Sequence, residues 1–402
     1  MTTRRELLRS LAVGGALLMT GSASRAGVPA SKHPRAIAMW DFSWLERRWP
    51  GAGYEDWDQA LDELAARGYD AVRIDAYPHL VDVDAQRSWL LKPQWDTEDW
   101  GAPTLVRVQV FPALQEFIVK CRDRHIKVGL STWFREDDGN VRTRVRTPKK
   151  LADIWCTTLA RLGDAGLLDT ILYVDLCNEW PGHVWSPLKA SPELQSWADR
   201  RSMTWMRTAI SAVRAKFPEI PLLFSTDNDR VEDFADHDVS FMDAIEHHLW
   251  MVGENDDEFY KLVGYEYQRF SQAGYHNVQL KAARLYADRP EYWNKLLTAK
   301  IGRLAEASRR AKQPVMTTEC WAIVDYKDWP MLPWDWVKAV CELGVSTASA
   351  TGQWAALATS NFCGPQFHGM WRDVDWHRRL TSTIKAGSMD PMLHAGRLWN
   401  RL

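Results

Sequence analysis

Short apolar segments alternate with longer amphipathic segments along almost the whole chain. The apolar segments have the length and the content of Val, Ile and aromatic residues that are typical of buried strands, and the segments between them have the periodicity of helices. Strands joined by helices pair in parallel through right-handed crossovers. Eight such units in about 350 residues predict a closed (β/α)8 barrel, the TIM barrel of the α/β class. The predicted strands lie at 36–44, 71–78, 127–134, 171–174, 221–226 and 243–251, in a run that ends at Glu319, and at 346–355.

The barrel is expected to be a single domain. A chain of 402 residues could hold more than one domain, but α/β barrels of this size commonly form one. There is no internal repeat and no linker rich in Pro or Ser, so residues 31–402 are predicted to be one barrel domain. The longest connections follow the second, sixth and eighth strands, and the one at 253–291 is predicted to be an unusually long loop. Such βα loops surround the mouth of a barrel, so we expect a walled cleft there.

The first 30 residues are expected to be a removable export signal. Arg4 and Arg5 precede an apolar stretch at 11–19 and small residues at 23–26, which is the order of a signal peptide. The paired arginines favour the twin-arginine route, and a basic tail without a targeting role is the alternative. No later stretch approaches the ~18 uninterrupted apolar residues of a membrane span. The sequence therefore predicts a periplasmic or secreted protein without stable membrane insertion.

Composition narrows the classes of partner. The chain has 50 basic and 52 acidic residues, and this near-neutral balance argues against nucleic acid, which requires a concentrated positive field. Tryptophan is unusually abundant at 23 residues, and we expect about half of them in the core and others as platforms for sugar rings. The six cysteines show no CxxC spacing, so buried free thiols are expected. Oligomeric state is left open.

Two carboxylates stand at the ends of predicted strands. Glu179 follows the fourth strand directly after Asn178, and Glu319 ends the seventh. The fourth and seventh strands lie across the barrel mouth from each other, where barrels keep their chemistry. A retaining glycosidase needs two carboxyls about 5–5.5 Å apart, one protonated and one ionised. We therefore predict that Glu179 and Glu319 form such a pair, that Arg73 keeps Glu319 ionised, and that Asn178 donates to the neighbouring sugar hydroxyl.

These residues, in this order, resemble the clan A glycoside hydrolases and are most similar to family 5, the cellulase-like enzymes. The resemblance rests on Asn178-Glu179, Glu319, Arg73 in the segment VRIDAYP and His248-Leu249-Trp250. It implies that Glu179 is the acid/base and Glu319 the nucleophile of a β-glycosidase acting on a carbohydrate. It also implies that His248 orients the surroundings of the nucleophile, that Trp250 replaces a tyrosine, and that Trp354 floors the sugar site. Further substrate-binding residues are predicted at strand ends: Trp40, Asp41, Trp133, Asn228 and Trp321.

Two departures from the family concern the substrate. The third strand ends in Ser131-Thr132-Trp133 where the family commonly has a histidine pair, and Trp40-Asp41 is not a typical cellulase pattern. Both leave the carboxylate pair intact, but they point to a β-linked sugar other than that of common cellulases. The sugar, the linkage and the choice between internal and terminal attack stay open.

Two other classes of function fit parts of the sequence. A barrel that binds glycans without hydrolysing them would keep the aromatic platforms, although it would have no need of both carboxylates. A metal-dependent barrel hydrolase would carry His-x-His near its first strand, and none of the eleven histidines forms one there. The adjacent pair His247-His248 points to opposite faces of a strand. We therefore predict no metal and no cofactor.

Overall fold

The computed structural model describes residues 32–94, 101–181, 196–227, 230–266, 271–326 and 332–402. The chain divides into two units, residues 1–32 and 33–402, and every element below belongs to the second. The predicted export signal at 1–30 lies outside the described residues. None of the described helices is long and apolar enough to cross a membrane.

A parallel sheet that closes on itself forms the centre of this unit. Its strands follow the order β7-β6-β5-β2-β1-β13-β11-β9-β8. β7 and β8 stand on either side of Phe224 as two halves of one strand, so the two ends of the order meet and the barrel closes. The predicted (β/α)8 barrel is confirmed. The strands are β1 (Arg35–Ala38), β2 (Ala71–Asp75), β5 (Lys127–Ser131), β6 (Ile171–Asp175), β7 (Leu222–Leu223), β8 (Ser225–Thr226), β9 (Ile245–His247), β11 (Val315–Thr317) and β13 (Trp354–Ala358).

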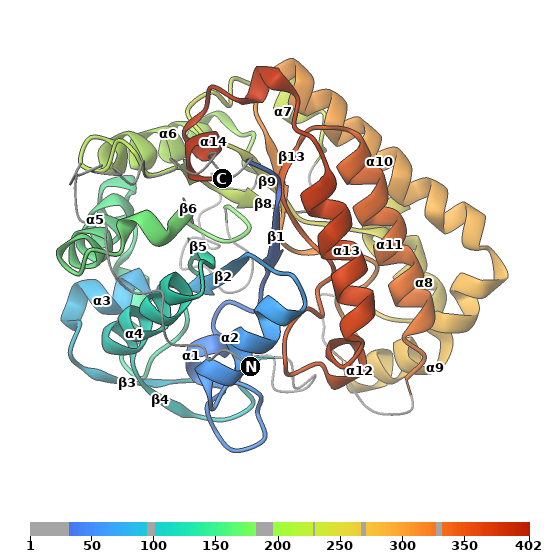
Figure 1. The fold of residues 1–402 in the computed structure, drawn as a ribbon, viewed down its shortest axis with the longest axis horizontal. Coiled ribbons are helices and arrows are strands. Elements are labelled where there is room, and N and C mark those ends of the chain that lie inside the picture. The colour runs from blue at the N-terminus through green and yellow to red at the C-terminus, as the bar shows by residue number, and fades with distance from the viewer. Residues whose placement is uncertain (1–31, 95–100, 182–195, 228–229, 267–270, 327–331) are drawn as a thin grey trace, which may run out of the picture. The chain divides into compact units, whose positions relative to one another are not determined.

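Long helices surround these strands, as Figure 1 shows. Side chains cap several of them: Asp56 accepts from the first free N–H groups of α2, and Thr147 does so for α5, which begins with a proline. Neighbouring helices pack on one another, for example α5 on α6 and α10 on α11. The main helices are α2 (Trp57–Ala66), α4 (Val110–Asp123), α5 (Pro148–Asp164), α6 (Arg200–Arg214), α10 (Pro290–Ala311), α11 (Asp335–Ala350) and α13 (Val374–Ala386).

Shorter elements occupy the connections. After β2 come a helix and an antiparallel hairpin, and after β9 come a short strand and two helices. These elements are α1 (Ser43–Glu46), α3 (Pro78–Asp84), β3 (Ser88–Leu91), β4 (Val106–Gln109), α7 (Asp233–Asp236), β10 (Leu249–Trp250), α8 (Glu254–Val263), α9 (Gln272–Asp288), β12 (Cys320–Trp321), α12 (His368–Trp371), α14 (Arg397–Arg401) and the 3₁₀ turns Val141–Arg144, Leu168–Thr170, Met251–Gly253 and Pro391–Leu393.

Two expectations about these segments are wrong. The eighth strand does not lie at 346–355, because α11 continues to Ala350 and the strand begins only at Trp354. Val345 and Ala348 are three residues apart and both buried, which suits one face of a helix, and Gly352 then turns the chain at a φ of +75°. The connection at 253–291 is largely helical, since it contains α8 and α9.

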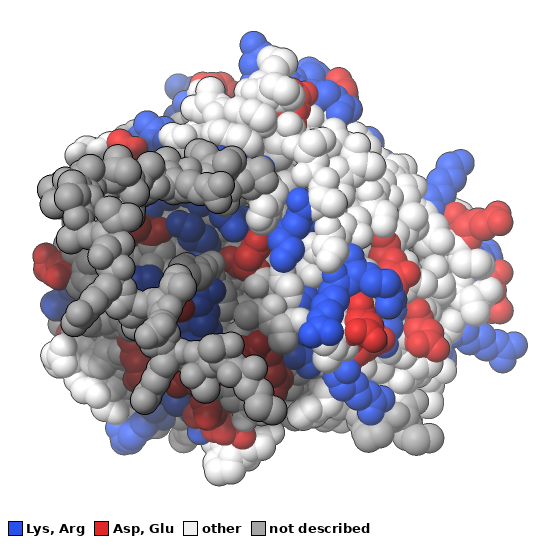
Figure 2. All heavy atoms as spheres, in the orientation of Figure 1, with Lys and Arg blue, Asp and Glu red and all other residues white. Residues whose placement is uncertain are grey.

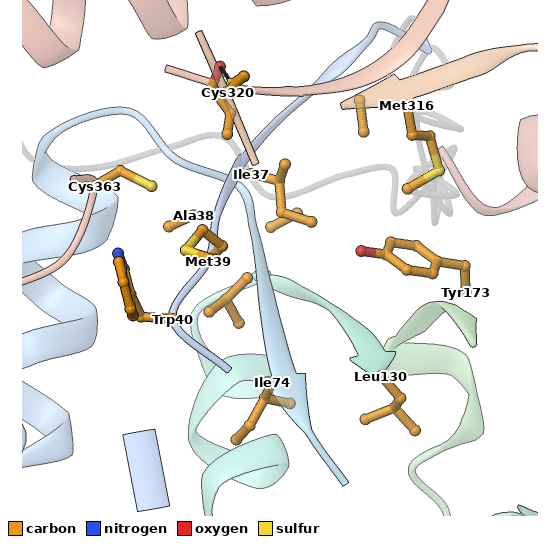
Figure 3. Packing of buried hydrophobic residues seen from close by; sticks show 14 of the residues in the cluster. Ile37, Ala38, Met39, Trp40, Ile74, Leu130, Tyr173, Met316, Cys320 and Cys363 are labelled. Carbon is orange, nitrogen blue, oxygen red and sulfur yellow. Dashed lines mark hydrogen bonds between the residues drawn. The ribbon is translucent and has the colours of Figure 1, made fainter. Parts of the chain in front are cut away.

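Apolar side chains from different strands fill the barrel. Figure 3 shows Ile37, Ile74, Leu130, Tyr173 and Met316 gathered from β1, β2, β5, β6 and β11, all fully buried. Much of the tryptophan excess also belongs to the core, because at least ten described tryptophans are less than 2% exposed. All six cysteines are buried and free, as predicted. On the face drawn in Figure 2, acidic and basic side chains lie close together rather than forming one continuous basic surface.

Two helical glycines offer a matched test of this packing. A Cβ at Gly344 in α11 would lie 2.6 Å from the ring of Trp321, whereas a Cβ at Gly302 in α10 would meet nothing within 4 Å. Gly344→Ala is therefore expected to lower the free energy of unfolding by about 1–3 kcal/mol through overpacking. Gly302→Ala is expected to raise it by about 0.5–1 kcal/mol, since alanine favours helix. Urea denaturation measures both, and changes of the same sign would contradict the packing described.

Candidate active site

Left-handed backbone geometry marks the carboxyl ends of four neighbouring strands. Trp40, Tyr77, Phe134 and Glu179 follow β1, β2, β5 and β6, and their φ angles are +83°, +46°, +51° and +52°. Such angles cost energy in residues other than glycine and persist where surrounding contacts impose them, commonly at functional sites. The strain therefore points to the same edge of the barrel as the predicted carboxylates.

A buried arginine organises this edge. The side chain of Arg73 is 1% exposed, and its Nε donates to both carboxylate oxygens of Asp41 at 2.8 and 2.9 Å. Its Nη2 donates to Asn178 Oδ1 at 2.9 Å and to Glu319 Oε1 at 2.5 Å, and its Nη1 donates to Thr318 Oγ1 at 2.5 Å. Burial alone would lower the pKa of Arg73, but Asp41 and Glu319 raise it well above its usual value. Arg73 is thus a fixed positive charge that links four strand ends.

The two candidate carboxylates converge on one point. A carboxylate oxygen of Glu179 lies within 4.8 Å of one of Glu319, and a ring nitrogen of His248 lies within the same distance of both. His248 Nδ1 is 2.8 Å from Glu179 Oε1 and 3.6 Å from Glu319 Oε1. Glu179 is 7% exposed and Glu319 is 3% exposed. Residues 140 positions apart in the chain therefore meet in one buried group.

Opposing effects set the protonation of this group. Burial raises the pKa of Glu319 to about 7, with His248 and Arg73 acting in the opposite direction and Glu179 adding to the rise. Burial alone would lower the pKa of His248, but Glu319 and the hydrogen bond to Glu179 raise it well above its usual value. The ionisation of Glu319 therefore depends on the charge of its neighbours, including Glu179. The group can therefore hold and move a proton near neutral pH.

Buried hydroxyl groups hold the backbone of Glu179. Its N–H donates to Ser225 Oγ at 2.8 Å, and Ser225 Oγ donates to Asp175 Oδ2 at 2.8 Å. Ser131 Oγ also donates to Asp175 Oδ2, at 2.9 Å. These contacts join β5, β6 and β8 beneath Glu179 and explain how its left-handed conformation is maintained.

A third carboxylate, Glu246, was missed by the sequence analysis. It lies on β9 and is 1% exposed, and its Oε1 accepts from Thr318 N at 3.1 Å and Thr318 Oγ1 at 2.6 Å. The same oxygen is 3.4 Å from His248 Nε2. The alternation of side chains along a strand puts residues 246, 248 and 250 on one face, so the signal was present in the sequence. His247 points the other way and contacts Thr226 Oγ1 at 2.9 Å.

Three aromatic residues stand beside this group. Trp133 donates from Nε1 to Asp41 Oδ2 at 2.5 Å, which ties it to the arginine network. Trp250 packs edge-on against His248 with ring centroids 5.8 Å apart, and its buried Nε1 has no hydrogen-bond partner among the described residues. Trp40 donates to the backbone oxygen of Asn361, just after β13. The structure thus brings Arg73, Asp41, Asn178, Glu179, His248, Trp250, Trp133 and Glu319 together at the barrel mouth.

Comparison with known proteins assigns a family to this arrangement. A family model named cellulase-like, with the description "sugar-binding cellulase-like", matches residues 37–385. The chain belongs to the cellulase-like family. A crystal structure of a protein from Parabacteroides distasonis ATCC 8503, provisionally described as a glycoside hydrolase, is 54% identical, covers 92% of this chain and 100% of its own, and has a TM-score of 0.90. No curated protein matches the sequence.

A more distant solved structure supports the fold alone. An endoglucanase is 11% identical, covers 88% of this chain and 97% of its own, and has a TM-score of 0.50. The likeness to cellulase-like glycoside hydrolases predicted from the sequence is confirmed by the family match and by the relative from Parabacteroides distasonis.

Two predicted sugar contacts of this cellulase-like protein are misplaced. Trp354 is the first residue of β13 rather than its last, is 1% exposed, and donates to Thr317 Oγ1 at 2.9 Å. Trp321 has no exposed surface, because its ring packs on Gly344 and its Nε1 donates to the Ala358 oxygen at 2.9 Å. Both belong to the core, so the expectation that they contact a sugar is wrong. Asn228 lies outside the described residues.

The carboxylate and imidazole atoms also have to be considered as metal ligands. Among the residues that the structure describes, Glu179, His248 and Glu319 are the one group of such atoms close enough to hold an ion. A metal would need an unprotonated imidazole and a free carboxylate. Here Arg73 donates to the Glu319 oxygen, and the neighbouring carboxylates favour protonation of His248. The donor set therefore fits proton transfer better than metal binding.

Proposed function

We propose that this cellulase-like protein is a secreted retaining β-glycosidase, with Glu179 as the acid/base and Glu319 as the nucleophile. The observation that carries the proposal is the approach of their carboxylate oxygens to within 4.8 Å. Carboxyl groups in retaining enzymes are about 5–5.5 Å apart, whereas inverting enzymes need about 6.5–9.5 Å to admit a water molecule. The short separation supports direct attack by Glu319 on the sugar.

In the first step, Glu319 attacks the anomeric carbon while Glu179 gives a proton to the leaving oxygen. Attack requires the ionised form of Glu319, which becomes populated as the pH rises through about 7. Arg73 holds the attacking carboxyl in place through its bond to Oε1. The products are a glycosyl ester on Glu319 and the released alcohol.

In the second step, Glu179 takes a proton from water, and that water displaces Glu319 from the sugar. Asn178 supports both steps. Its Oδ1 accepts from Arg73 at 2.9 Å, which fixes the amide, and its buried Nδ2 has no hydrogen-bond partner among the described residues. The amide N–H is therefore available to donate to the hydroxyl beside the reacting carbon, a bond that strengthens in the transition state.

The stereochemistry of the product tests this proposal. Aryl β-glycosides of glucose, mannose, galactose, xylose and furanoses are offered first, and proton NMR then follows the best substrate. We expect the β-anomer of the sugar to appear first, because two displacements at the same carbon restore its configuration. Early release of the α-anomer would contradict retention. Binding of glycans without turnover of any substrate would favour the alternative of a non-catalytic barrel.

A further inference from the structure

Glu246 is a buried carboxylate that the two displacement steps do not use. Its Oε1 receives two hydrogen bonds from Thr318, and its buried Oε2 has no hydrogen-bond partner among the described residues. Burial alone would raise the pKa of Glu246, but hydrogen bonding by His248 and Thr318 together with the charge of Arg73 lowers it. A permanent negative charge therefore lies directly beneath the candidate site.

The imidazole of His248 connects this charge to the acid/base. Its Nε2 is 3.4 Å from Glu246 Oε1, and its Nδ1 is 2.8 Å from Glu179 Oε1. A proton between Nδ1 and Oε1 belongs to His248 and Glu179 together. Whichever of the two residues holds the proton, loss of the proton makes the His248–Glu179 pair more negative by one charge. A carboxylate on the far side of the ring opposes that change.

We propose that Glu246 is a positioning residue that acts through His248 to keep the shared proton in the hydrogen bond between His248 and the acid/base Glu179. This inference rests on the proposed function, since only an acid/base needs that proton for the leaving group. Glu246 does not touch the sugar in this role. It orients the ring of His248 and opposes loss of the proton from the opposite side.

Other charged groups face the same ring. Arg73 Nη1 is 3.1 Å from His248 Nε2 and 4.0 Å from Glu246 Oε1, and it weakens the effect of Glu246. Glu319 Oε1 is 3.6 Å from Nδ1 and reinforces the effect. Tyr173 on β6 interacts with Glu246, but it is neutral near pH 7, because burial raises the pKa of its hydroxyl well above the usual value. The opposite charges of Arg73 and Glu319 largely offset each other at the ring of His248. The negative charge of Glu246 therefore remains as the net charge acting on the ring.

The test is the pH dependence of kcat/KM in Glu246→Gln. The amide keeps the shape and accepts from Thr318, but it removes the negative charge. The descending limb at high pH reports loss of the proton from the His248–Glu179 pair, so it is expected to move by roughly one pH unit to lower pH. Glu254→Gln is the matched control, because Glu254 is also largely buried but pairs with Lys300 at 2.8 Å. The descending limb of the pH profile of Glu254→Gln is expected to stay at the same pH.

A second pair of variants shows whether the effect passes through His248. In a His248→Asn background, adding Glu246→Gln is expected to move the limb no further. An unchanged limb in folded Glu246→Gln would overturn the proposal. An equal movement with and without His248 would also overturn it, since Glu246 would then act through the general field of the site.

A measurement on the unmodified protein does not depend on activity or on the folding of Glu246→Gln. The ¹⁵N shifts of the His248 ring, assigned by comparison with His248→Asn, are followed between pH 5 and 9. The ring is expected to titrate well above the ordinary value of about 6.5. Titration near 6.5 would overturn the inference about Glu246. If no β-glycoside is hydrolysed, the proposed function fails, while this titration still decides whether the proton is held.

Discussion

Glu319→Ala is expected to lower kcat/KM for an aryl β-glycoside by at least about 10⁴-fold, or about 5.5 kcal/mol in transition-state stabilisation. In the proposed mechanism the variant loses the group that forms the covalent bond to the sugar, and Arg73 keeps its other partners Asp41 and Asn178. Single-turnover and steady-state rates on an activated substrate measure the loss. Circular dichroism checks that the barrel still folds.

Added azide sharpens this experiment. In the proposed mechanism the space left by the Glu319 carboxyl faces the anomeric carbon, so azide is expected to restore part of the activity and to give the α-glycosyl azide. In Glu179→Ala, azide attacks the intermediate on Glu319, and the β-glycosyl azide is expected instead. Glu306→Ala removes an exposed glutamate of α10 that pairs with Arg309, and it is expected to behave like the unmodified protein. Full activity of Glu319→Ala would end the assignment of the nucleophile.

Arg73→Met is expected to lower the free energy of unfolding by about 3–5 kcal/mol and to abolish most activity. Removing one partner of a buried ion pair leaves the other charge unpaired in a medium that solvates it poorly. Arg73 compensates Asp41 and Glu319, whose side chains are 0% and 4% exposed. The methionine fills the volume, so the loss reports charge rather than a cavity.

Arg124→Met is the control for this second experiment. Arg124, directly after α4, also contacts two carboxylates, Asp58 and Asp62 of α2, but at the surface. Water screens such pairs, so the free energy of unfolding is expected to change little. Guanidinium denaturation followed by tryptophan fluorescence measures both variants. Equal stability of Arg73→Met and Arg124→Met would contradict the central role of Arg73.

The order of elements could be predicted from periodicity alone, because each strand and helix of a barrel shows its own repeat in the sequence. The eighth strand was misplaced because Val345, Ser346 and Ala348 suit either a strand or a buried helix face. Packing of α11 on Trp321 settles the choice in favour of helix. That contact joins separate segments, so a local pattern does not contain it.

Part of the site was also predictable from local patterns in the sequence. Polar residues that end apolar runs stand out in the sequence, and Glu179, Glu319, Arg73 and Asn178 were found in this way. Trp321 and Trp354 also stand at or near the ends of such runs, yet they face the core. Alternation along β9 could have indicated Glu246, but a lone carboxylate inside an apolar strand shows its role only when its neighbours Thr318 and His248 are known.

By itself, the sequence determined the barrel, the family and the presence of two carboxylates at strand ends, because these depend on repeats and on residues that mark strand ends. The tertiary structure alone decided which of the many buried polar groups share a space. Closure of the sheet brings Arg73, His248 and Glu246 against Glu179 and Glu319, and burial makes their charges interact strongly. The protonation of the site follows from distances between segments far apart in the chain, and these distances exist only in the folded barrel.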